Sequence, residues 1–240
     1  MGRPPVPLDQ AAVVIRARQV LARAKKMAAD TAKAEPKPAA KKLPKIVANT
    51  TDPDSRIMPT RRGFVQGYNV QVAITADQLI AACDVGQSSN DQRSFIPMMH
   101  ASQAAAAQLH AATNDDRHVI GCVLADAGYH SNNNLSAAGP DRLIATGKGR
   151  DQARAAAEDP ACGPPPPDAT PAETNAHRLR TSEGRALYKR RGATVEPGIG
   201  NLKKILARFS RRGLENASQE THLAATAFNI MKIYRATAAT

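Results

Sequence analysis

An alternating stretch in the first half of the chain restricts the fold more than any other sequence feature. The segment GFVQGYNVQVAIT, residues 63–75, places Val70, Val72 and Ile74 on one face of an extended chain and other residues on the opposite face. A period of two residues predicts a β-strand. The residues ADQ then supply a turn before a second apolar segment at 79–85. The sequence therefore predicts an antiparallel hairpin.

An unbroken apolar run from Val119 to Leu124 predicts a third strand. Apolar residues on both faces are typical of a strand inside a sheet, so we expect a central position. The run ends at Asp126, within the segment VLADAGYH. A carboxylate at the end of a buried strand belongs either to an ordinary turn or to a metal-binding or catalytic site.

Helical patterns and one further strand surround these segments. Residues 9–34 have apolar positions seven apart, with Arg and Lys on the other faces, which predicts a helix that either packs on protein or contacts DNA. Residues 151–176 contain CGPPPPDATPAE, with too many prolines for regular structure, so we expect an exposed insertion. The other expected elements are helices at 92–109, 132–138, 183–208 and 214–236 and a strand at 142–146.

These elements together predict an α/β fold with a mixed sheet flanked by helices. We expect two parts: residues 1–48, with the basic helix and a Pro- and Lys-rich linker, and a main domain over 49–236 that includes the Pro-rich insertion.

Composition narrows the classes of partner. The chain has 33 Lys and Arg against 21 Asp and Glu, a formal net charge of +12 and a pI of about 10.0. Such a charge favours a polyanion, most commonly nucleic acid, over the alternative of a basic protein without a specific partner. No segment has the ~20 apolar residues that a membrane span needs. The first residues lack a signal peptide's apolar region, so we expect a cytoplasmic protein. The three cysteines form no CxxC pair, which argues against a structural zinc site and a disulfide framework.

A second chemically suggestive segment is LYKRRGATVEPGIGNLKK, residues 187–204. Glu196 and Lys203 are seven residues apart, two helical turns, and would share a face. A carboxylate flanked by basic groups suits a metal-assisted reaction on phosphate, because carboxylates bind Mg²⁺ and cations hold phosphates. The alternative from spacing alone is a solvated helix of mixed charge.

Several motifs, in order, resemble bacterial insertion-sequence transposases of the DDE type. They are NTTDPDSRIMPTRRGFVQGYNVQVAI, ADAGYHSNNNL, RLRTSEGRALYKRRGATVEPGIGNLKK and HLAATAFNIMKIYR, and the resemblance extends over roughly residues 45–236. It implies a ribonuclease H-like catalytic core that cleaves and joins DNA strands with two divalent ions, Mg²⁺ or Mn²⁺. The implied partners are double-stranded DNA, as element ends and target, and a second copy in a homodimer.

The resemblance also assigns residues. Asp126 matches the second metal-binding carboxylate of the family, which follows a central strand in an ADxGY context. Glu196 matches the glutamate of a Tyr–Arg–Glu–Lys signature on a helix. Both would be catalytic metal ligands, and we expect their carboxylates within about 10 Å of each other. The residues expected to contact DNA are Tyr188, Arg191, Lys203 and Lys204.

Two departures from the family pattern bear on activity. The first family aspartate, on an opening strand in a DGT-like context, is not found before residue 63, as in an N-terminally truncated copy. Asp52 and Asp54 are the nearest carboxylates, and we expect a supporting role for them because Pro53 makes a turn. Pro197 disfavours helical geometry at Glu196, so we expect a kink there. The chain is thus either a DDE enzyme or a remnant that only binds DNA.

Overall fold

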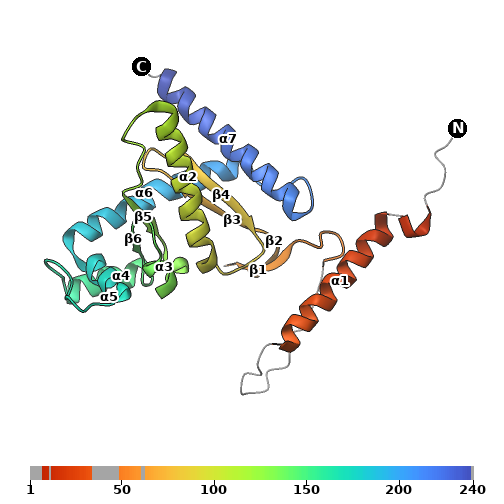
Figure 1. The fold of residues 1–240 in the computed structure, drawn as a ribbon, viewed down its shortest axis with the longest axis horizontal. Helices are drawn as coiled ribbons and strands as arrows, with labels where there is room; N and C mark the ends of the chain where they lie inside the picture. The colour runs from red at the N-terminus through yellow and green to blue at the C-terminus, as the bar shows by residue number, and fades with distance from the viewer. Residues whose placement is uncertain (1–6, 11, 34–48, 61–62, 239–240) are drawn as a thin grey trace.

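The computed structural model describes residues 7–10, 12–33, 49–60 and 63–238 (Figure 1). Over these residues the fold is mixed α/β. The helices are α1 (Ala12–Lys33), α2 (Phe95–Thr113), α3 (Asn132–Ser136), α4 (Gly149–Glu158), α5 (Pro171–Arg180), α6 (Ser182–Ile205) and α7 (Leu214–Ala238), with 3-10 turns at Leu8–Gln10, Gln92–Ser94 and Ala127–Tyr129. The strands are β1 (Arg56–Thr60), β2 (Gly63–Gly67), β3 (Asn69–Ile74), β4 (Ile80–Gly86), β5 (Cys122–Ala125) and β6 (Asp141–Ile144).

The strands in the described part of the chain form three two-stranded sheets. The β3–β4 pair is the predicted antiparallel hairpin, which is confirmed, and β5 pairs with β6 in parallel. The expectation of one mixed sheet with a central third strand was wrong, because β5 has one partner strand. Gly121 weakens the beginning of the predicted run, and Val119 before it is 72% exposed. Only the last residues of that run enter the core.

The alternating stretch is divided between two sheets at Tyr68. Its first part, β2, pairs with β1, a strand that sequence reasoning did not predict. Strand β1 contains Pro59, which is tolerated because each strand of this ribbon is an edge strand. Phe64 on β2 is 77% exposed, so the ribbon buries little of its own surface.

Two apolar cores hold the sheets against the helices. In the first, Ile80 on β4 packs with Leu202 of α6 and Phe228 of α7. In the second, Phe95 and Met99 of α2 pack with residues of β5 and β6. Ala125, the last residue of β5, belongs to this second core, whereas the next residue, Asp126, is exposed. The core therefore fixes the strand end from which Asp126 projects.

Two asparagines on helices complete the backbone hydrogen bonding of strands. Asn175 of α5 accepts from the Ile144 N–H at 2.9 Å and donates to the Ile144 carbonyl at 2.7 Å. Asn229 of α7 makes the same pair of bonds with Ile80, at 2.8 and 2.9 Å. These amides satisfy backbone groups that a further strand would otherwise pair, and so protect short sheets from an open edge.

The Pro-rich segment differs from the expected irregular insertion. Helices α4 and α5 cover most of residues 151–176, and irregular structure is confined to residues 159–170. Thr170 and Glu173 form a capping box at the start of α5, with Pro171 in the first turn, so this proline favours the helix. Asn175 is only 4% exposed. The expectation of a wholly irregular, exposed segment was wrong at these helices.

Helix α6 is continuous through Pro197, so the expected kink at Glu196 was also wrong. Pro197 has no N–H to donate to the carbonyl four residues earlier, which weakens the helix locally. The helix continues because Gly198 and Leu202 are buried, with Gly198 close against Ile74 of β3. The predicted helices at 9–34, 92–109, 132–138, 183–208 and 214–236 are otherwise confirmed within a few residues at their ends.

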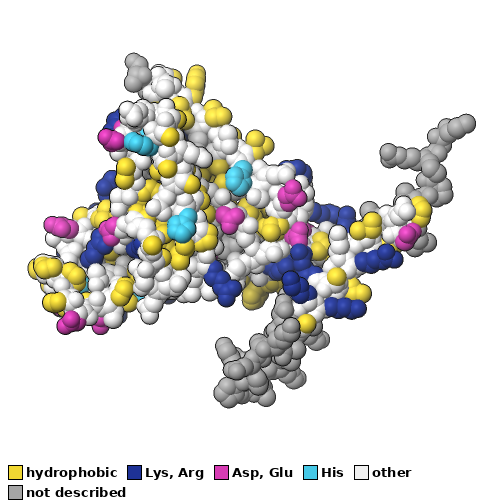
Figure 2. Space-filling model, in the orientation of Figure 1, with side chains coloured by type: hydrophobic (Ala, Val, Ile, Leu, Met, Phe, Trp, Pro, Cys, Tyr) yellow, Lys and Arg dark blue, Asp and Glu magenta, His cyan; other side chains and the backbone are white. Residues whose placement is uncertain are grey.

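Helix α1 lies outside the body of the fold and approaches it near residues 53–54 (Figure 1). Lys and Arg side chains follow α1 in Figure 2, and Leu21 is 56% exposed. The helix therefore does not bury its apolar positions fully within this chain. The predicted Pro- and Lys-rich linker lies in residues 34–48, outside the described residues. None of the described helices combines the length and apolar character required to cross a membrane.

Candidate active site and DNA-contacting residues

Asp126 begins a tight turn at the end of β5. Its backbone is extended, and its Oδ1 accepts a hydrogen bond from the Gly128 N–H at 3.0 Å. This bond caps the 3-10 turn Ala127–Tyr129, which is the ordinary turn role that the sequence left open. The side chain is exposed, and its second oxygen makes no hydrogen bond with the described residues. One carboxylate oxygen therefore holds the turn while the other is available to a ligand.

A second carboxylate, Asp91, approaches Asp126 from the loop between β4 and α2. A Cβ added at Gly128 would lie 3.1 Å from Oδ1 of Asp126 and 3.2 Å from Oδ2 of Asp91. The two carboxylates are therefore close neighbours beside Gly128. Sequence reasoning missed Asp91, which lies in the segment SSND, where only a helix cap was expected. Asp91 and Asp126 are 35 positions apart along the chain, so the sequence alone does not indicate that they lie close together.

Side chains of β3 hold Asp91 in place. Its Oδ1 accepts hydrogen bonds from the Asn69 amide at 2.6 Å and from the Gln71 amide at 2.8 Å. Gln71 is 4% exposed, and its oxygen accepts a hydrogen bond from the Tyr129 hydroxyl. Tyr129 belongs to the turn that Asp126 caps. A hydrogen-bond chain therefore connects the two carboxylates through Gln71 and Tyr129 and fixes their relative position.

The shifted pKa of Tyr129 also indicates that Asp91 and Asp126 lie close to each other. Burial raises the pKa of Tyr129, and the nearby carboxylates of Asp91 and Asp126 raise it further. The Arg191 guanidinium acts in the opposite direction and lowers this pKa. Tyr129 therefore remains a neutral hydrogen-bond donor at neutral pH, with two carboxylates and one guanidinium around it.

Helix α6 reaches the same strand end through Tyr188. The Tyr188 hydroxyl donates to the carbonyl of Ala125 at 3.2 Å, immediately before Asp126. The Arg191 guanidinium lies 5.6 Å from the centre of the Tyr188 ring, a cation–π contact. Burial raises the pKa of Tyr188, and Arg191 opposes that effect. Three of the residues singled out in the sequence, Asp126, Tyr188 and Arg191, are thus gathered at one place.

Glu196 lies two turns further along α6 and is exposed. Its carboxylate lies 3.9 Å from the position that a Cβ at Gly192 would occupy, so it points back along the helix. It makes no hydrogen bond or ion pair with another described residue. Among the described residues, no group of three or more His, Cys, Asp or Glu side chains is arranged to hold a metal ion. A close approach of Glu196 to Asp126 stays a prediction.

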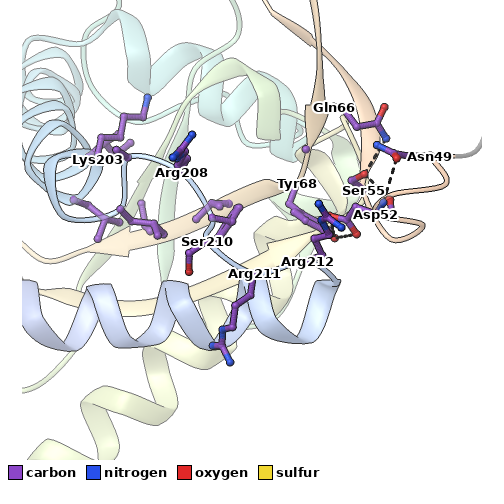
Figure 3. A pocket seen from close by; sticks show the side chains of 18 residues that line it. Asn49, Asp52, Ser55, Gln66, Tyr68, Lys203, Arg208, Ser210, Arg211 and Arg212 are labelled. Atoms are coloured by element: carbon purple, nitrogen blue, oxygen red, sulfur yellow. Dashed lines mark hydrogen bonds between the residues drawn. The ribbon is translucent and has the colours of Figure 1, made fainter. Parts of the chain in front are cut away.

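The two lysines of the signature lie at the end of α6 and are exposed. Lys204 donates to the side-chain oxygen of Asn201 at 3.1 Å. Lys203 makes no ion pair with the described carboxylates and lines a pocket (Figure 3). Both side chains can approach an anion from solvent, and their contact with DNA stays a prediction.

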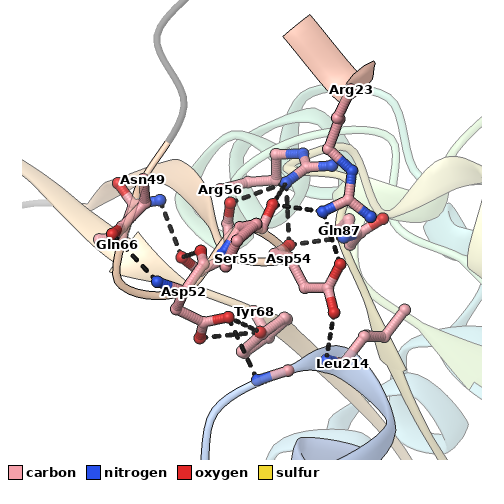
Figure 4. Close-up of polar contacts among 12 residues, drawn as sticks. Arg23, Asn49, Asp52, Asp54, Ser55, Arg56, Gln66, Tyr68, Gln87 and Leu214 are labelled. Carbon is pink, nitrogen blue, oxygen red and sulfur yellow. Dashed lines mark hydrogen bonds and ion pairs between the residues drawn. The ribbon is translucent and has the colours of Figure 1, made fainter. Parts of the chain in front are cut away.

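Asp52 binds residues near the beginning of α7 (Figure 4). Its two carboxylate oxygens each accept from the Tyr68 hydroxyl at 2.8 Å, and Oδ1 also accepts from the Gly213 N–H at 3.1 Å. Burial is the main reason that the pKa of Tyr68 is raised, and the hydrogen bond to Asp52 adds to it. The contacts of Asp52 tie the β2–β3 junction to the α6–α7 connection.

Asp54 binds the first residue of α7. Its Oδ2 accepts from the Leu214 N–H at 3.1 Å, and its Oδ1 lies 2.5 Å from the Arg23 guanidinium of α1 (Figure 4). Burial raises the pKa of Asp54, but the Leu214 N–H and Arg23 outweigh burial, so the pKa is lowered overall. A carboxylate at a helix N-terminus is favourable because the first amides have no partner within the helix. In this structure Asp52 and Asp54 anchor α7.

Comparison with known proteins gives one match, to the C-terminal helices of the chain. Residues 167–234 match the model of a family described as a transposase DDE domain. No curated protein matches this chain, and no solved structure does, so the ribonuclease H-like arrangement stays a prediction. The matched residues include α5, α6 and most of α7, and hence Tyr188, Arg191 and Glu196. Asp126 lies before them.

The match points to a general class of function for the matched segment. Residues 167–234 are similar to a transposase DDE domain, and domains of that kind act in DNA transposition. Enzymes of this family act on DNA, and the family implies use of a divalent metal.

Proposed function

We propose that this chain cleaves and joins DNA strands in transposition, with a divalent metal ion held at the end of β5. The observation that carries the proposal is the hydrogen bond from Tyr188 to the carbonyl of Ala125. It joins α6, which lies in the family-matched region, to the residue before Asp126. The two segments that resemble DDE transposases therefore meet in space, although more than 60 positions separate them in sequence.

The residues at this strand end fit a divalent ion. Oxygens of Asp91 and Asp126 lie 3.2 and 3.1 Å from the position of a Cβ at Gly128, so the two carboxylates are neighbours, and the Asp126 oxygen that does not cap the turn is free to accept a ligand. Mg²⁺ is commonly held by one or two carboxylates together with water and substrate phosphates. Asp91 and Asp126 would hold the ion, and Glu196 would contribute to the second ion that the resemblance implies. When bound, Mg²⁺ or Mn²⁺ stabilises negative charge on phosphate oxygens and lowers the pKa of water.

The chain's other residues would orient the DNA. Arg191 has a guanidinium whose Nε is buried and makes no hydrogen bond to the described residues, while the group as a whole lies beside Tyr188. A guanidinium held in this way can donate to phosphate oxygens, with its position limited by the tyrosine ring. Lys203 and Lys204 would neutralise further phosphates along α6. Tyr188 would act as a positioning residue, because it fixes α6 against β5.

A second candidate function is DNA binding without cleavage. It is favoured by the exposed position of Glu196 and by the lack of a three-ligand group among the described residues. In this case the basic residues would bind duplex DNA while the carboxylates contributed only to turns and local hydrogen bonding. The homodimer implied by the resemblance is a separate prediction for either function, and light scattering of the purified chain measures it.

The test combines a cleavage assay with a metal-binding assay. A supercoiled plasmid that carries the chain's own gene and its flanking DNA is incubated with protein and Mg²⁺ or Mn²⁺. We expect metal-dependent nicking that Asp126→Asn abolishes. Electron paramagnetic resonance of free Mn²⁺ measures binding independently of cleavage, and Asp91→Asn and Asp126→Asn should each weaken it.

Asp77→Asn is the matched control, because Asp77 is an exposed carboxylate in the turn between β3 and β4, at the opposite end of the hairpin from Asn69. It should leave Mn²⁺ affinity and nicking unchanged. DNA binding without nicking under either metal, with Mn²⁺ affinity equal in all variants, would establish the binding function and exclude the enzyme.

A further inference from the structure

A pocket of about 1030 Å³ lies at the C-terminal end of α6, away from Tyr188 (Figure 3). The end of α6 and the α6–α7 connection form one side, and the β1–β2 ribbon, β3 and the segment before β1 form the other. The lining residues that matter here are Lys203, Arg208, Arg211, Arg212, Tyr68 and Phe209.

Most of the positive charge in this pocket has no acidic partner. Lys203, Arg208 and Arg212 are exposed and make no ion pair with the described carboxylates. Figure 3 shows the nitrogen ends of Lys203 and Arg208 pointing the same way, away from α7. Arg211 differs, because it extends to α7 and pairs with Glu220 at 3.3 Å. Three cations therefore remain available to a ligand.

The acidic residue of the lining does not neutralise them. Asp52 already accepts hydrogen bonds from the Tyr68 hydroxyl and the Gly213 N–H. These donors stabilise its charge on the wall of the pocket. The ring of Tyr68 also packs edge to face against Phe209, with centroids 5.7 Å apart and an interplanar angle of 85°. The Tyr68–Phe209 contact thus joins the two sides of the pocket, and the free cations lie along the side formed by α6 and the α6–α7 connection.

We propose that this pocket binds backbone phosphates of duplex DNA, at a second contact surface apart from the carboxylates at the end of β5. On α6 the 15 positions from Tyr188 to Lys203 correspond to about 22 Å along the helix axis. Contacts this far apart can engage different phosphates of one duplex, because each strand of B-DNA advances 3.4 Å per phosphate. The proposal rests on the proposed function for the identity of the partner as DNA.

The experiment measures binding of a fluorescent duplex of about 30 base pairs and mixed sequence, by anisotropy, between ~50 and ~200 mM salt. Each phosphate contact contributes about 0.9 to the slope of log affinity against log salt. The double variant Arg208→Ala/Arg212→Ala should therefore lower that slope by about 2. Between ~50 and ~200 mM salt, the affinity of the double variant for DNA should therefore fall by a factor about ten times smaller than the affinity of the parent chain does.

Two further variants make the result specific. Arg150→Ala/Arg154→Ala removes the same charge from α4, outside the pocket, and should leave the slope nearly unchanged. Arg208→Lys/Arg212→Lys retains the charge and should retain the slope. An equal loss in the α4 variant, or an unchanged slope in Arg208→Ala/Arg212→Ala, would overturn the proposal. So would tighter binding of single-stranded RNA than of the DNA duplex.

The outcome is distinguishable from failure of the proposed function. If the parent chain binds DNA through this pocket but never nicks it, the pocket is supported and strand cleavage is refuted. If the pocket variant binds with the parent's affinity and slope while both nick DNA, the pocket is refuted and cleavage is supported.

Discussion

Two glycines on α6 provide a matched test of how this helix packs against β3. A Cβ at Gly198 would lie 2.5 Å from Cδ1 of Ile74 and 3.4 Å from its Cγ2. A Cβ at Gly200, on the same helix, would meet nothing within 4 Å. The substitutions Gly198→Ala and Gly200→Ala therefore change helix propensity in the same way and differ only in what the new methyl group contacts.

The magnitude follows from two opposing effects. Alanine stabilises a helix interior by about 0.5–1 kcal/mol relative to glycine, so Gly200→Ala should raise the free energy of unfolding by roughly that amount. At Gly198 the same gain is opposed by overpacking, which costs about 1–3 kcal/mol when a methyl group is forced into a filled site. Gly198→Ala should therefore be about 1–3 kcal/mol less stable than Gly200→Ala.

Urea denaturation followed by circular dichroism measures both variants against the parent chain. A third variant identifies the contact: Ile74→Val removes Cδ1, the atom nearest the new methyl group. Combined with Gly198→Ala it should recover part of the lost stability, seen as a favourable coupling energy in a double-mutant cycle. Equal stabilities for the Gly198 and Gly200 variants would show that α6 does not pack closely on β3, and the position of Glu196 would then need revision.

Two other predictions concern the polar contacts. The lowered pKa of Asp54 means that its ionised form stabilises the fold above the unfolded-state value near 4, and that this contribution is lost as pH falls through the folded-state pKa. In urea titrations Asp54→Asn should cost about 1–2 kcal/mol at pH 7 and progressively less as the pH falls through the folded-state pKa, and a cost independent of pH would contradict the charged contact. Tyr129→Phe leaves the buried Gln71 oxygen without its donor, so it should cost about 1–3 kcal/mol and weaken Mn²⁺ binding. Tyr234→Phe, at a ring 70% exposed, should do neither.

The sequence predicted individual helices and strands better than it predicted which strands pair with each other. Periodicities of two and of three to four residues are local, so the hairpin of β3 and β4 and the long helices α6 and α7 were recognisable. Strand pairing is not local. Nothing in the alternation of residues 63–75 indicates that it divides at Tyr68, with β2 turning to β1. The apolar run before Asp126 predicted a strand but could not show that β6 is its sole strand partner in the described chain.

In the candidate site, too, residues within local motifs were predictable and contacts between distant segments were not. Asp126, Tyr188 and Arg191 were identified from motifs, and the structure gathers them at the end of β5. Asp91 was missed because its importance depends on the fold, which brings a loop residue over Gly128. Asp54 binds an N-terminal amide of α7, a contact that depends on a partner 160 positions away, and a supporting role in catalysis stays a prediction. Contacts of this kind have no periodic signature.

The arrangement of the sheets explains why α6 matters to the chemistry. Asp91 is held by side chains of β3, and Asp126 follows β5, but the sheets that contain these two strands share no backbone ladder among the described residues. Their relative position depends on side-chain contacts, including the hydrogen bond between Tyr129 and Gln71. Helix α6 adds a contact to each sheet, through Tyr188 at β5 and Gly198 at β3. Because a ladder is absent, the separation of the two carboxylates depends on how α6 packs, and this helix therefore also sets the geometry of the proposed metal-binding position.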